Sequence, residues 1–535
     1  MGAATERSTQ VLVIGAGPVG LTIALDLSAR GVEVVVVESR HRGEPPSVKC
    51  NHVSARSMEI FRRLGVAPAV RNAGLPPDYP NDVAYRTTTT GIELTRIPIP
   101  CRRDRYTATG GPDTWWPTPE PPHRINQIFL EPILFEHAQR RVTILCRTQL
   151  QSFEQREDAV VATVRDLESG VERRLQAQFL IGCDGGRSLV RRTIGATLVG
   201  DAVVQRVQST HIRAPALLSL LKAPPAWGTF SLNPRRSGNV YAIDGRETWL
   251  VHNYLRDDEP DFESVDRDWA IRQILGVGGD FEYEVIAKED WFGRRLVADR
   301  FRDRRAFLCG DAAHLWVPYA GYGMNAGIAD AANLAWLLAA HLKGWAPAAI
   351  VDAYERERLP ITEQVSHFAM NHAHEMSKRR AGVPAEIEDG GPAGEAARER
   401  VGRDAYDLNV QQYCAAGLNF GYFYDDSPII AYDDDTPPPY TMGSFTESTV
   451  PGCRLPHFRL ADGRSLYDAL SDGYTLLRFD ASVDVEPLAA AARAVGMPLA
   501  VLDVAAGDVP AAYRHRLVLA RPDQHVGWRG DAVPD

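Results

Sequence analysis

Residues 10–38, QVLVIGAGPVGLTIALDLSARGVEVVVVE, decide the fold of the N-terminal part of the chain. The apolar run 11–14 predicts a strand that is buried on both faces of a parallel sheet, and 32–37 predicts a second one. Between the two strands lies a turn whose glycines follow G-x-G-x-x-G spacing. These glycines are Gly15, Gly17 and Gly20.

This turn is typical of a dinucleotide-binding unit, in which the three glycines allow a tight turn, the approach of a pyrophosphate and close helix packing. We expect a helix over 18–30, with Pro18 in its first turn and Gly31 after its end. The N-terminus of this helix would face the pyrophosphate. Glu38 ends the second strand and can accept hydrogen bonds from ribose hydroxyls. Because its carboxylate would repel a 2′-phosphate, we expect FAD or NAD at this turn rather than NADP.

Length and composition exclude several classes of protein. The 535 residues predict two or three domains, and a formal net charge of −10 argues against a nucleic-acid partner. The seven cysteines form no C-x-x-C pair and no metal-ligand spacing, which favours reduced thiols in a cytoplasm and no metal site. We find no signal peptide and no apolar run near the roughly 18 residues that span a bilayer, so we expect a cytoplasmic protein without a membrane partner.

A second signature lies in 177–195, AQFLIGCDGGRSLVRRTIG. An apolar strand runs into Asp184 and two glycines, and a basic segment follows. An Asp-Gly pair is usually a plain turn, but after a buried strand it becomes a candidate for a second dinucleotide contact.

The third signature lies in 304–342, where a short apolar strand delivers Gly310 and Asp311 to a loop. Gly321 and Gly323 then shape the entry to a helix that we expect over 324–342, because its apolar residues follow the helical period. The free N–H groups at the start of this helix would face whatever lies beside Gly323.

The remaining segments predict the domain organisation. Between 201 and 289 the apolar pattern changes to period two, which predicts an antiparallel sheet with one face open to a ligand. Residues 76–124 read as loop or edge-strand material. We predict a discontinuous cofactor domain over 1–75, 120–200 and 290–395, a substrate domain over 76–119 and 201–289, a helical and linker region over 396–447, and a small α/β domain over 448–535.

Together the three signatures resemble those of the single-component flavoprotein aromatic hydroxylases, the family that includes para-hydroxybenzoate hydroxylase and phenol hydroxylase. The resemblance implies a Rossmann-type FAD-binding domain with an inserted, mainly antiparallel substrate domain. It also implies that 448–535 is a thioredoxin-like domain, which here has no C-x-x-C pair. We therefore expect this domain to serve packing or dimerisation, so a homodimer is one expected assembly.

The resemblance also assigns cofactor contacts. The first motif would hold the ADP half of FAD, Asp184 would belong to a motif tied to both FAD and NAD(P)H, and Asp311 would bind the ribityl hydroxyls. Gln127 and Lys49 match positions near the flavin phosphates, where the family often has Arg in place of Lys49. The implied cofactor-binding residues are Gly15, Gly17, Pro18, Gly20, Glu38, Lys49, Gln127, Asp184, Gly310, Asp311, Gly323, Met324 and Asn325.

The implied activity is hydroxylation of a small phenolic substrate with NAD(P)H and O2, through a flavin C4a-hydroperoxide. Phenol hydroxylases have a catalytic Asp at the position that aligns with Asn51, and an amide cannot act as a base. His52, the next residue, is therefore our candidate for the catalytic base. Tyr322 departs from the family pattern as well, because relatives have Gln there.

Two other functions remain open at this stage. The same scaffold supports Baeyer–Villiger or epoxidising FAD monooxygenases that act on polycyclic, polyketide-type substrates. An FAD-containing binding or regulatory protein is the third alternative, and it would show no substrate-stimulated oxidation of NAD(P)H.

Overall fold

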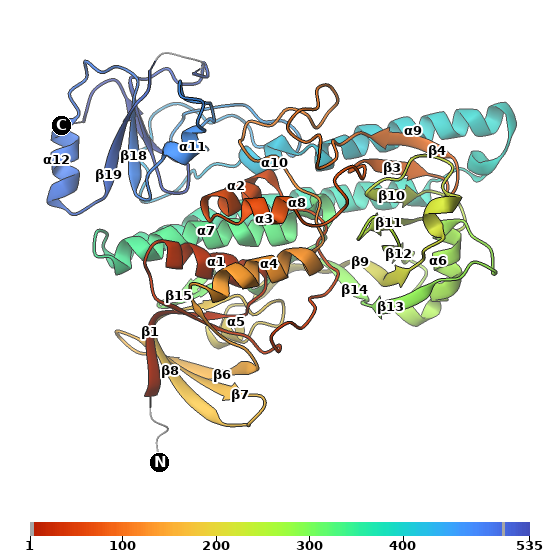
Figure 1. The fold of residues 1–535 in the computed structure, drawn as a ribbon, viewed down its shortest axis with the longest axis horizontal. Coiled ribbons are helices and arrows are strands. Elements are labelled where there is room, and N and C mark those ends of the chain that lie inside the picture. Colours follow the sequence, from red (N-terminus) through yellow and green to blue (C-terminus); the bar gives the residue numbers. More distant parts are fainter. Residues whose placement is uncertain (1–4, 506–508, 535) are drawn as a thin grey trace.

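The computed structural model describes residues 5–505 and 509–534, which form three β-sheets and the helices around them (Figure 1). The first sheet has a parallel core in the order β16-β8-β1-β2-β5. Antiparallel strands extend it at β8 and β16. Its strands are β1 (Thr5–Ile14), β2 (Val34–Val37), β5 (Thr143–Leu145), β6 (Thr148–Gln155), β7 (Val160–Asp166), β8 (Glu172–Gly182), β15 (Arg302–Asp303) and β16 (Ala306–Leu308).

The first sheet has the topology that the N-terminal motif predicts. From β1 the chain continues to β2 on one side, and it later returns to β8 on the other side. In open α/β sheets, ligands bind at the carboxyl ends of the strands where the strand order reverses in this way. The Rossmann-type prediction is therefore confirmed, and the cleft beyond β1 and β8 is the expected cofactor position.

Two long helices cover this sheet close to the cleft. Helix α1 (Pro18–Ala29) follows β1 directly, and α7 (Tyr322–Leu342) packs against α1. Their approach depends on glycine, because a Cβ atom at Gly327 of α7 would lie 2.6 Å from Cγ2 of Val19 on α1. The other helices of the first 450 residues are α2 (Ala55–Arg63), α3 (Ala67–Arg71), α4 (Gln127–Gln139), α5 (Leu189–Thr193), α6 (Arg267–Leu275), α8 (Ala353–Ala381), α9 (Gly391–Tyr413) and α10 (Ala416–Phe420). Short 3₁₀ turns span Leu217–Leu220, Phe262–Ser264, Gly310–Ala312, Tyr319–Gly321, Ala348–Asp352 and Ala385–Glu388.

The second sheet is mainly antiparallel and has the order β17-β14-β9-β12-β11-β10-β3-β4, with β13 paired to β9. The one parallel pair that the structure describes in it joins β10 to β3. The predicted ligand-facing sheet is thus present. Its strands are β3 (Val83–Arg86), β4 (Glu93–Ile97), β9 (Leu198–Arg213), β10 (Gly228–Ser231), β11 (Gly238–Ala242), β12 (Thr248–Tyr254), β13 (Glu284–Lys288), β14 (Trp291–Ala298) and β17 (His314–Trp316).

Two details differ from the sequence prediction. The interpretation of 76–124 as loop or edge strand is wrong for β3, which lies between β10 and β4 and is buried at all four residues. The stretch 290–395 also supplies β14 and β17 to the second sheet. Because strands cross between the two units in this way, the domain boundaries that we gave remain a prediction.

The C-terminal domain is built on a third sheet in the order β19-β18-β20-β21. β18 and β19 are parallel and are joined through a helix, whereas β20 and β21 form an antiparallel hairpin next to β18. This is the thioredoxin-like arrangement that we expected. Its elements are α11 (Leu466–Ala469), β18 (Tyr474–Arg478), α12 (Glu486–Ala494), β19 (Leu499–Asp503), β20 (Leu517–Ala520) and β21 (Val526–Gly530).

Figure 1 shows the blue C-terminal domain at one end of the molecule and the second sheet at the other, with α7 between them. None of the helices in the described ranges is long and apolar enough to cross a membrane. No group of three or more His, Cys, Asp or Glu side chains within those ranges could hold a metal ion.

Candidate functional site

A cavity of about 290 Å³ is lined by the second sheet, the 48–52 segment, the Gly310–Ala312 turn, the start of α7 and the end of α9. Eight of its lining side chains are aromatic, and the rings come from segments far apart in the sequence. Such a surface suits a flat, unsaturated ligand, because aromatic rings pack favourably on one another. The aromatic lining residues are Trp227, Phe230, Tyr241, Tyr254, Trp291, Trp316, Tyr319 and Tyr413.

One buried cation faces this aromatic space. The guanidinium of Arg124 lies 4.4 Å from the centre of the Trp227 ring and 5.8 Å from that of Tyr413. Burial lowers its pKa and the more distant Asp113 opposes the shift, but a guanidinium stays charged. Within the described residues no carboxylate forms an ion pair with Arg124. The cavity therefore contains a positive charge that can be paired by a ligand.

His52 lies beside Arg124 and is 7% exposed. Because a guanidinium can only donate, Nδ1 of His52 accepts from Arg124 and the neutral ring has its proton on Nε2. Burial and the charge of Arg124 hold the pKa of His52 well below its ordinary value. Both facts disfavour the role of general base that we expected from the sequence. The geometry leaves His52 as a hydrogen-bond donor through Nε2–H. Its neighbour Asn51 accepts from the side-chain amide of Asn126.

The glycine turn after β1 has the shape that a pyrophosphate site requires. A Cβ atom at Gly15 would overlap the carbonyl oxygen of Cys183, and one at Gly20 would overlap the carbonyl oxygen of Gly15. These two glycines thus serve the turn and the packing of α1. A Cβ atom at Gly17, in contrast, would meet nothing within 4 Å. Gly17 also caps α1 without a side-chain hydrogen bond, and Pro18 follows, so the N–H groups of the first turn face open space.

Glu38 lies at the end of β2, next to this turn. Its carboxylate accepts from the backbone N–H of Ala16 at 2.7 Å and from that of Arg40 at 2.9 Å. Burial alone would raise the pKa of Glu38, but the hydrogen bonds and the charge of Arg40 hold it below its usual range. Arg40, which the sequence analysis missed, also forms an ion pair with Glu131 at 2.6 Å. The predicted contact of Glu38 with a ribose stays a prediction.

Asp184 and Gln127 are two further residues that the resemblance assigns to the cofactor. One oxygen of Asp184 accepts from the backbone N–H groups of Leu189 at 2.7 Å and Val190 at 3.2 Å, at the start of α5. Its other oxygen is buried and has no partner within the described residues, so it can accept from a ligand. The side-chain amide of Gln127 donates to Glu131 at 2.9 Å.

Four of the predicted cofactor residues line the large cavity: Lys49, Asp311, Gly323 and Met324. Asp311 is exposed to this space. Desolvation by the surrounding protein nevertheless raises the pKa of its carboxyl group above the usual range, and the charges of His314 and Lys49 offset only part of this rise. Lys49 forms an ion pair with Glu289 at 2.8 Å.

Asn325 does not line the cavity. Its side chain is 2% exposed, and its oxygen accepts from the backbone of Ser54 at 2.8 Å and from the hydroxyl of Ser57 at 2.7 Å. Its amide donates to the backbone of His52 and of Gly321. Asn325 therefore fastens the start of α7 to the 52–57 segment, and a direct cofactor contact by its side chain is not favoured.

The residues present fit a flavin dinucleotide. The turn around Gly17 offers space and unpaired N–H groups for phosphates, and Asp184 offers an orphaned acceptor. The N-terminus of α7, which also lacks a side-chain cap, opens on the aromatic cavity beside Asp311. A dinucleotide that extends from Gly17 toward Asp311 would thus place its ring system beside the aromatic cavity.

Comparison with known proteins agrees with this geometry. The sequence pattern of a family described as "FAD binding domain" matches residues 8–369, and one described as "Aromatic-ring hydroxylase, C-terminal" matches 448–535. The FAD-dependent monooxygenase apdD of Emericella nidulans is 30% identical, over 98% of this chain and 88% of its own.

Two solved structures are also similar. The rebeccamycin biosynthetic enzyme RebC with reduced flavin superposes with a TM-score of 0.88 at 35% identity, over 99% of this chain and 97% of its own. Aklavinone-11 hydroxylase, in a ternary complex with FAD and aklavinone, superposes with a TM-score of 0.80 at 27% identity, over 100% of this chain and 97% of its own.

Fold and cleft together define an FAD-binding flavoprotein. The chain belongs to the family of FAD-dependent aromatic-ring hydroxylases, and it is an FAD-dependent monooxygenase. The family resemblance inferred from the three sequence motifs is thereby confirmed.

The glycine turn provides the first testable prediction. Gly17→Val places a side chain in the open space where the pyrophosphate would lie, so we expect loss of bound FAD from a protein that still folds. FAD content is measured from the flavin absorbance of the purified protein, and folding from its circular dichroism. The control is Gly279→Val, because a Cβ atom there also meets nothing within 4 Å. A Gly17→Val protein with full FAD content would contradict the assignment.

Proposed function

We propose that the protein uses NADH or NADPH and O2 to hydroxylate a phenolic substrate with an extended, multi-ring skeleton. The observation that supports this proposal most is Arg124, a buried cation without a carboxylate partner among the described residues, in a cavity with aromatic walls. When bound, FAD would accept a hydride from the nicotinamide and activate O2. The protein's own residues bind and orient the substrate and control its charge.

Arg124 suits the binding of a phenolate. A phenol has an ordinary pKa of about 10 and becomes a far better nucleophile when it loses its proton. A desolvated guanidinium lowers the pKa of a neighbouring phenol, because the attraction between opposite charges is strong where water is excluded. The protein therefore needs no general base with a pKa near neutrality at this position. This accounts for an Asn where phenol hydroxylases have an acid.

His52 would assist Arg124 as a second donor. Its Nε2–H can hydrogen-bond to an oxygen in the cavity, while its Nδ1 accepts from Arg124 and holds both side chains in place. We thus retain His52 as a catalytic residue, but as a donor of a hydrogen bond rather than a base.

The start of α7 supports the cofactor side of the reaction. The N–H groups of its first turn lack a side-chain cap and lie beside Gly323 and Met324 at the cavity wall. The positive end of the helix dipole favours negative charge there, which a reduced flavin ring would carry.

A multi-ring substrate fits the size and the lining of the cavity better than a single ring does. Eight aromatic side chains of the described residues line it, and they come from the second sheet, the segments next to it and α9. The similar aklavinone-11 hydroxylase forms a ternary complex with FAD and aklavinone, which supports this choice. The alternative activity, Baeyer–Villiger oxidation or epoxidation of a polycyclic substrate, requires no phenolate and therefore gives Arg124 no role.

Product analysis tests the proposed function. Single-ring phenols, multi-ring phenols and multi-ring ketones without a phenol are each incubated with the FAD-loaded enzyme, NAD(P)H and O2. We expect NAD(P)H consumption and a gain of one oxygen on the ring with the multi-ring phenols. Insertion of oxygen next to the carbonyl of the ketones would support the Baeyer–Villiger alternative and reject hydroxylation.

Two variants test the assignment of the two donors. Arg124→Gln should lower kcat/KM by roughly 10- to 100-fold, because a charge-assisted contact is lost. This deficit should shrink as pH rises toward the pKa of the phenol and free phenolate becomes available. His52→Ala should slow turnover by roughly 100-fold at every pH, and His52→Gln, which keeps a donor, should recover part of the rate. Recovery of His52→Ala at high pH would instead identify His52 as the base.

A further inference from the structure

The C-terminal domain meets the rest of the chain through charged side chains that are almost fully buried. Within the described residues this network contains three arginines and three carboxylates, so its charges balance. Each buried charge loses its hydration, so removing one partner of such a network leaves another charge uncompensated. The members are Arg56, Glu59, Glu357, Arg454, Arg521 and Asp523, all at most 7% exposed.

Arg521 is the central contact of the C-terminal domain. It lies in the turn between β20 and β21 and donates to both oxygens of Glu357, at 2.6 and 2.8 Å. The same guanidinium donates to Asp523 at 2.8 Å, and the side chains of Arg521 and Glu357 are fully buried. A planar fork held by two carboxylates fixes both position and direction.

Glu357, the partner of Arg521, precedes a residue that reaches the Gly310–Asp311 turn through Asp330, and we call this turn the cofactor loop. Glu357 is followed on α8 by Arg358, whose Nε donates to Asp330 of α7 at 2.9 Å. The other oxygen of Asp330 accepts from the backbone N–H of Gly310 at 3.2 Å and from Nε2 of His314 at 2.8 Å. Asp330 therefore holds both ends of the turn that carries Asp311, one of the residues of the cofactor cleft.

Burial decides how firmly Asp330 holds this turn. Its side chain is fully buried, which alone would raise the pKa of its carboxyl group. The charges of Arg358 and His314 and their hydrogen bonds outweigh burial and keep the pKa below its usual range. Asp330 is thus an ionised, desolvated group that depends on Arg358 for its charge balance.

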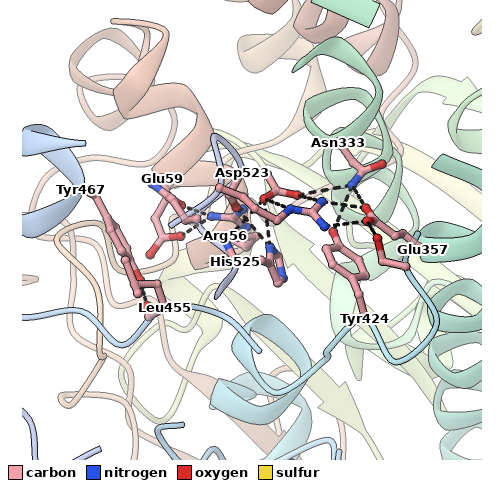
Figure 2. A network of polar contacts seen from close by, with 12 residues as sticks. Arg56, Glu59, Asn333, Glu357, Tyr424, Leu455, Tyr467, Asp523 and His525 are labelled. Carbon is pink, nitrogen blue, oxygen red and sulfur yellow. Dashed lines mark hydrogen bonds and ion pairs between the residues drawn. The ribbon is translucent and has the colours of Figure 1, made fainter. Parts of the chain in front are cut away.

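Further hydrogen bonds join the C-terminal domain to α7 and α2. The amide of Asn333, one turn after Asp330 on α7, donates to Glu357 at 2.6 Å and to Asp523 at 3.4 Å. Figure 2 shows Asp523 between two groups, with Asn333 and Glu357 on one side and Arg56 on the other. Arg56 of α2 donates to the backbone oxygen of Asp523 at 2.6 Å. The C-terminal domain therefore contacts α2, α7 and α8, and the start of α7 lines the cavity.

We propose that the C-terminal domain is a positioning element for the cofactor, in which Arg521 acts through Glu357, Arg358 and Asp330 on the Gly310–Asp311 turn. The proposal rests on the FAD site and not on the proposed substrate. Loss of Arg521 leaves Glu357 and Asp523 as buried anions, so α8 must shift or admit water at this point. Arg358 belongs to the same helical turn as Glu357, and any shift reaches Asp330.

Flavin titration of the full-length apoprotein tests the proposal. Arg521→Met should raise the dissociation constant of FAD roughly tenfold and shift the midpoint potential of the bound flavin. Glu357→Gln should do the same. Arg521→Lys keeps the charge but loses the fork, and it should weaken FAD binding less. Arg478→Met is the matched control, because Arg478 pairs with Asp503 at the exposed edge of the same domain, and it should bind FAD like the wild type.

Thermal unfolding separates positioning from mere stability. Each variant is titrated well below its own Tm, where circular dichroism shows a native fold. A purely structural role predicts a lower Tm with an unchanged FAD dissociation constant and flavin potential, and this result would overturn the proposal. If Arg521→Met does not fold, Arg521→Lys decides, since wild-type FAD binding in that variant also overturns it. Neither readout involves a substrate, so failure of the proposed hydroxylation leaves this test intact.

Discussion

A single desolvated carboxylate, that of Asp330, determines how the cofactor loop is held. Three donors from three different elements converge on it: the backbone of Gly310, the ring of His314 and the guanidinium of Arg358. A buried carboxylate without these partners would be expensive, whereas with them it fixes the loop against α7 and α8. The close approach of α1 and α7, which glycines permit, then brings this loop beside the dinucleotide turn.

Asp330 and Arg124 are both buried charged groups near the cleft, but they differ in whether the protein itself supplies the opposite charge. At Asp330 every charge is balanced by the protein itself, which gives rigidity. At Arg124 the charge is left without a carboxylate partner among the described residues and faces the cavity, where we propose that it pairs with a ligand anion. A balanced cofactor loop and a cation without a carboxylate partner thus lie near one cavity, and the hydroxylation of a phenolate that we propose would use both.

Much of the fold could be predicted from local pattern. The G-x-G-x-x-G turn, its two apolar strands and the period-two strands between 227 and 254 have signals that act over a few residues, and the structure has these elements. Strand β3 was missed because its short run lies in a Pro- and Gly-rich segment, and only the pairing with β10 and β4 shows that it is internal.

The site was predicted less completely, for a physical reason. Motif residues such as Gly17 and Asp311 could be found because their roles depend on their neighbours in the sequence. Arg124 and Tyr413 lie almost 300 residues apart, and no local signal shows that they share a cavity. The role of His52 depends on Arg124 as well, since that contact fixes its tautomer and lowers its pKa.

The most direct test of the account is the affinity for FAD of an Asp330→Asn variant in which Asp311 is intact. The amide keeps the size of the side chain but removes the charge that holds the Gly310–Asp311 turn. We predict that the apoprotein variant folds and binds FAD about 10- to 100-fold more weakly than the wild type, as expected for the loss of charge-assisted hydrogen bonds. An unchanged dissociation constant would contradict the claim that this buried carboxylate positions the cofactor loop.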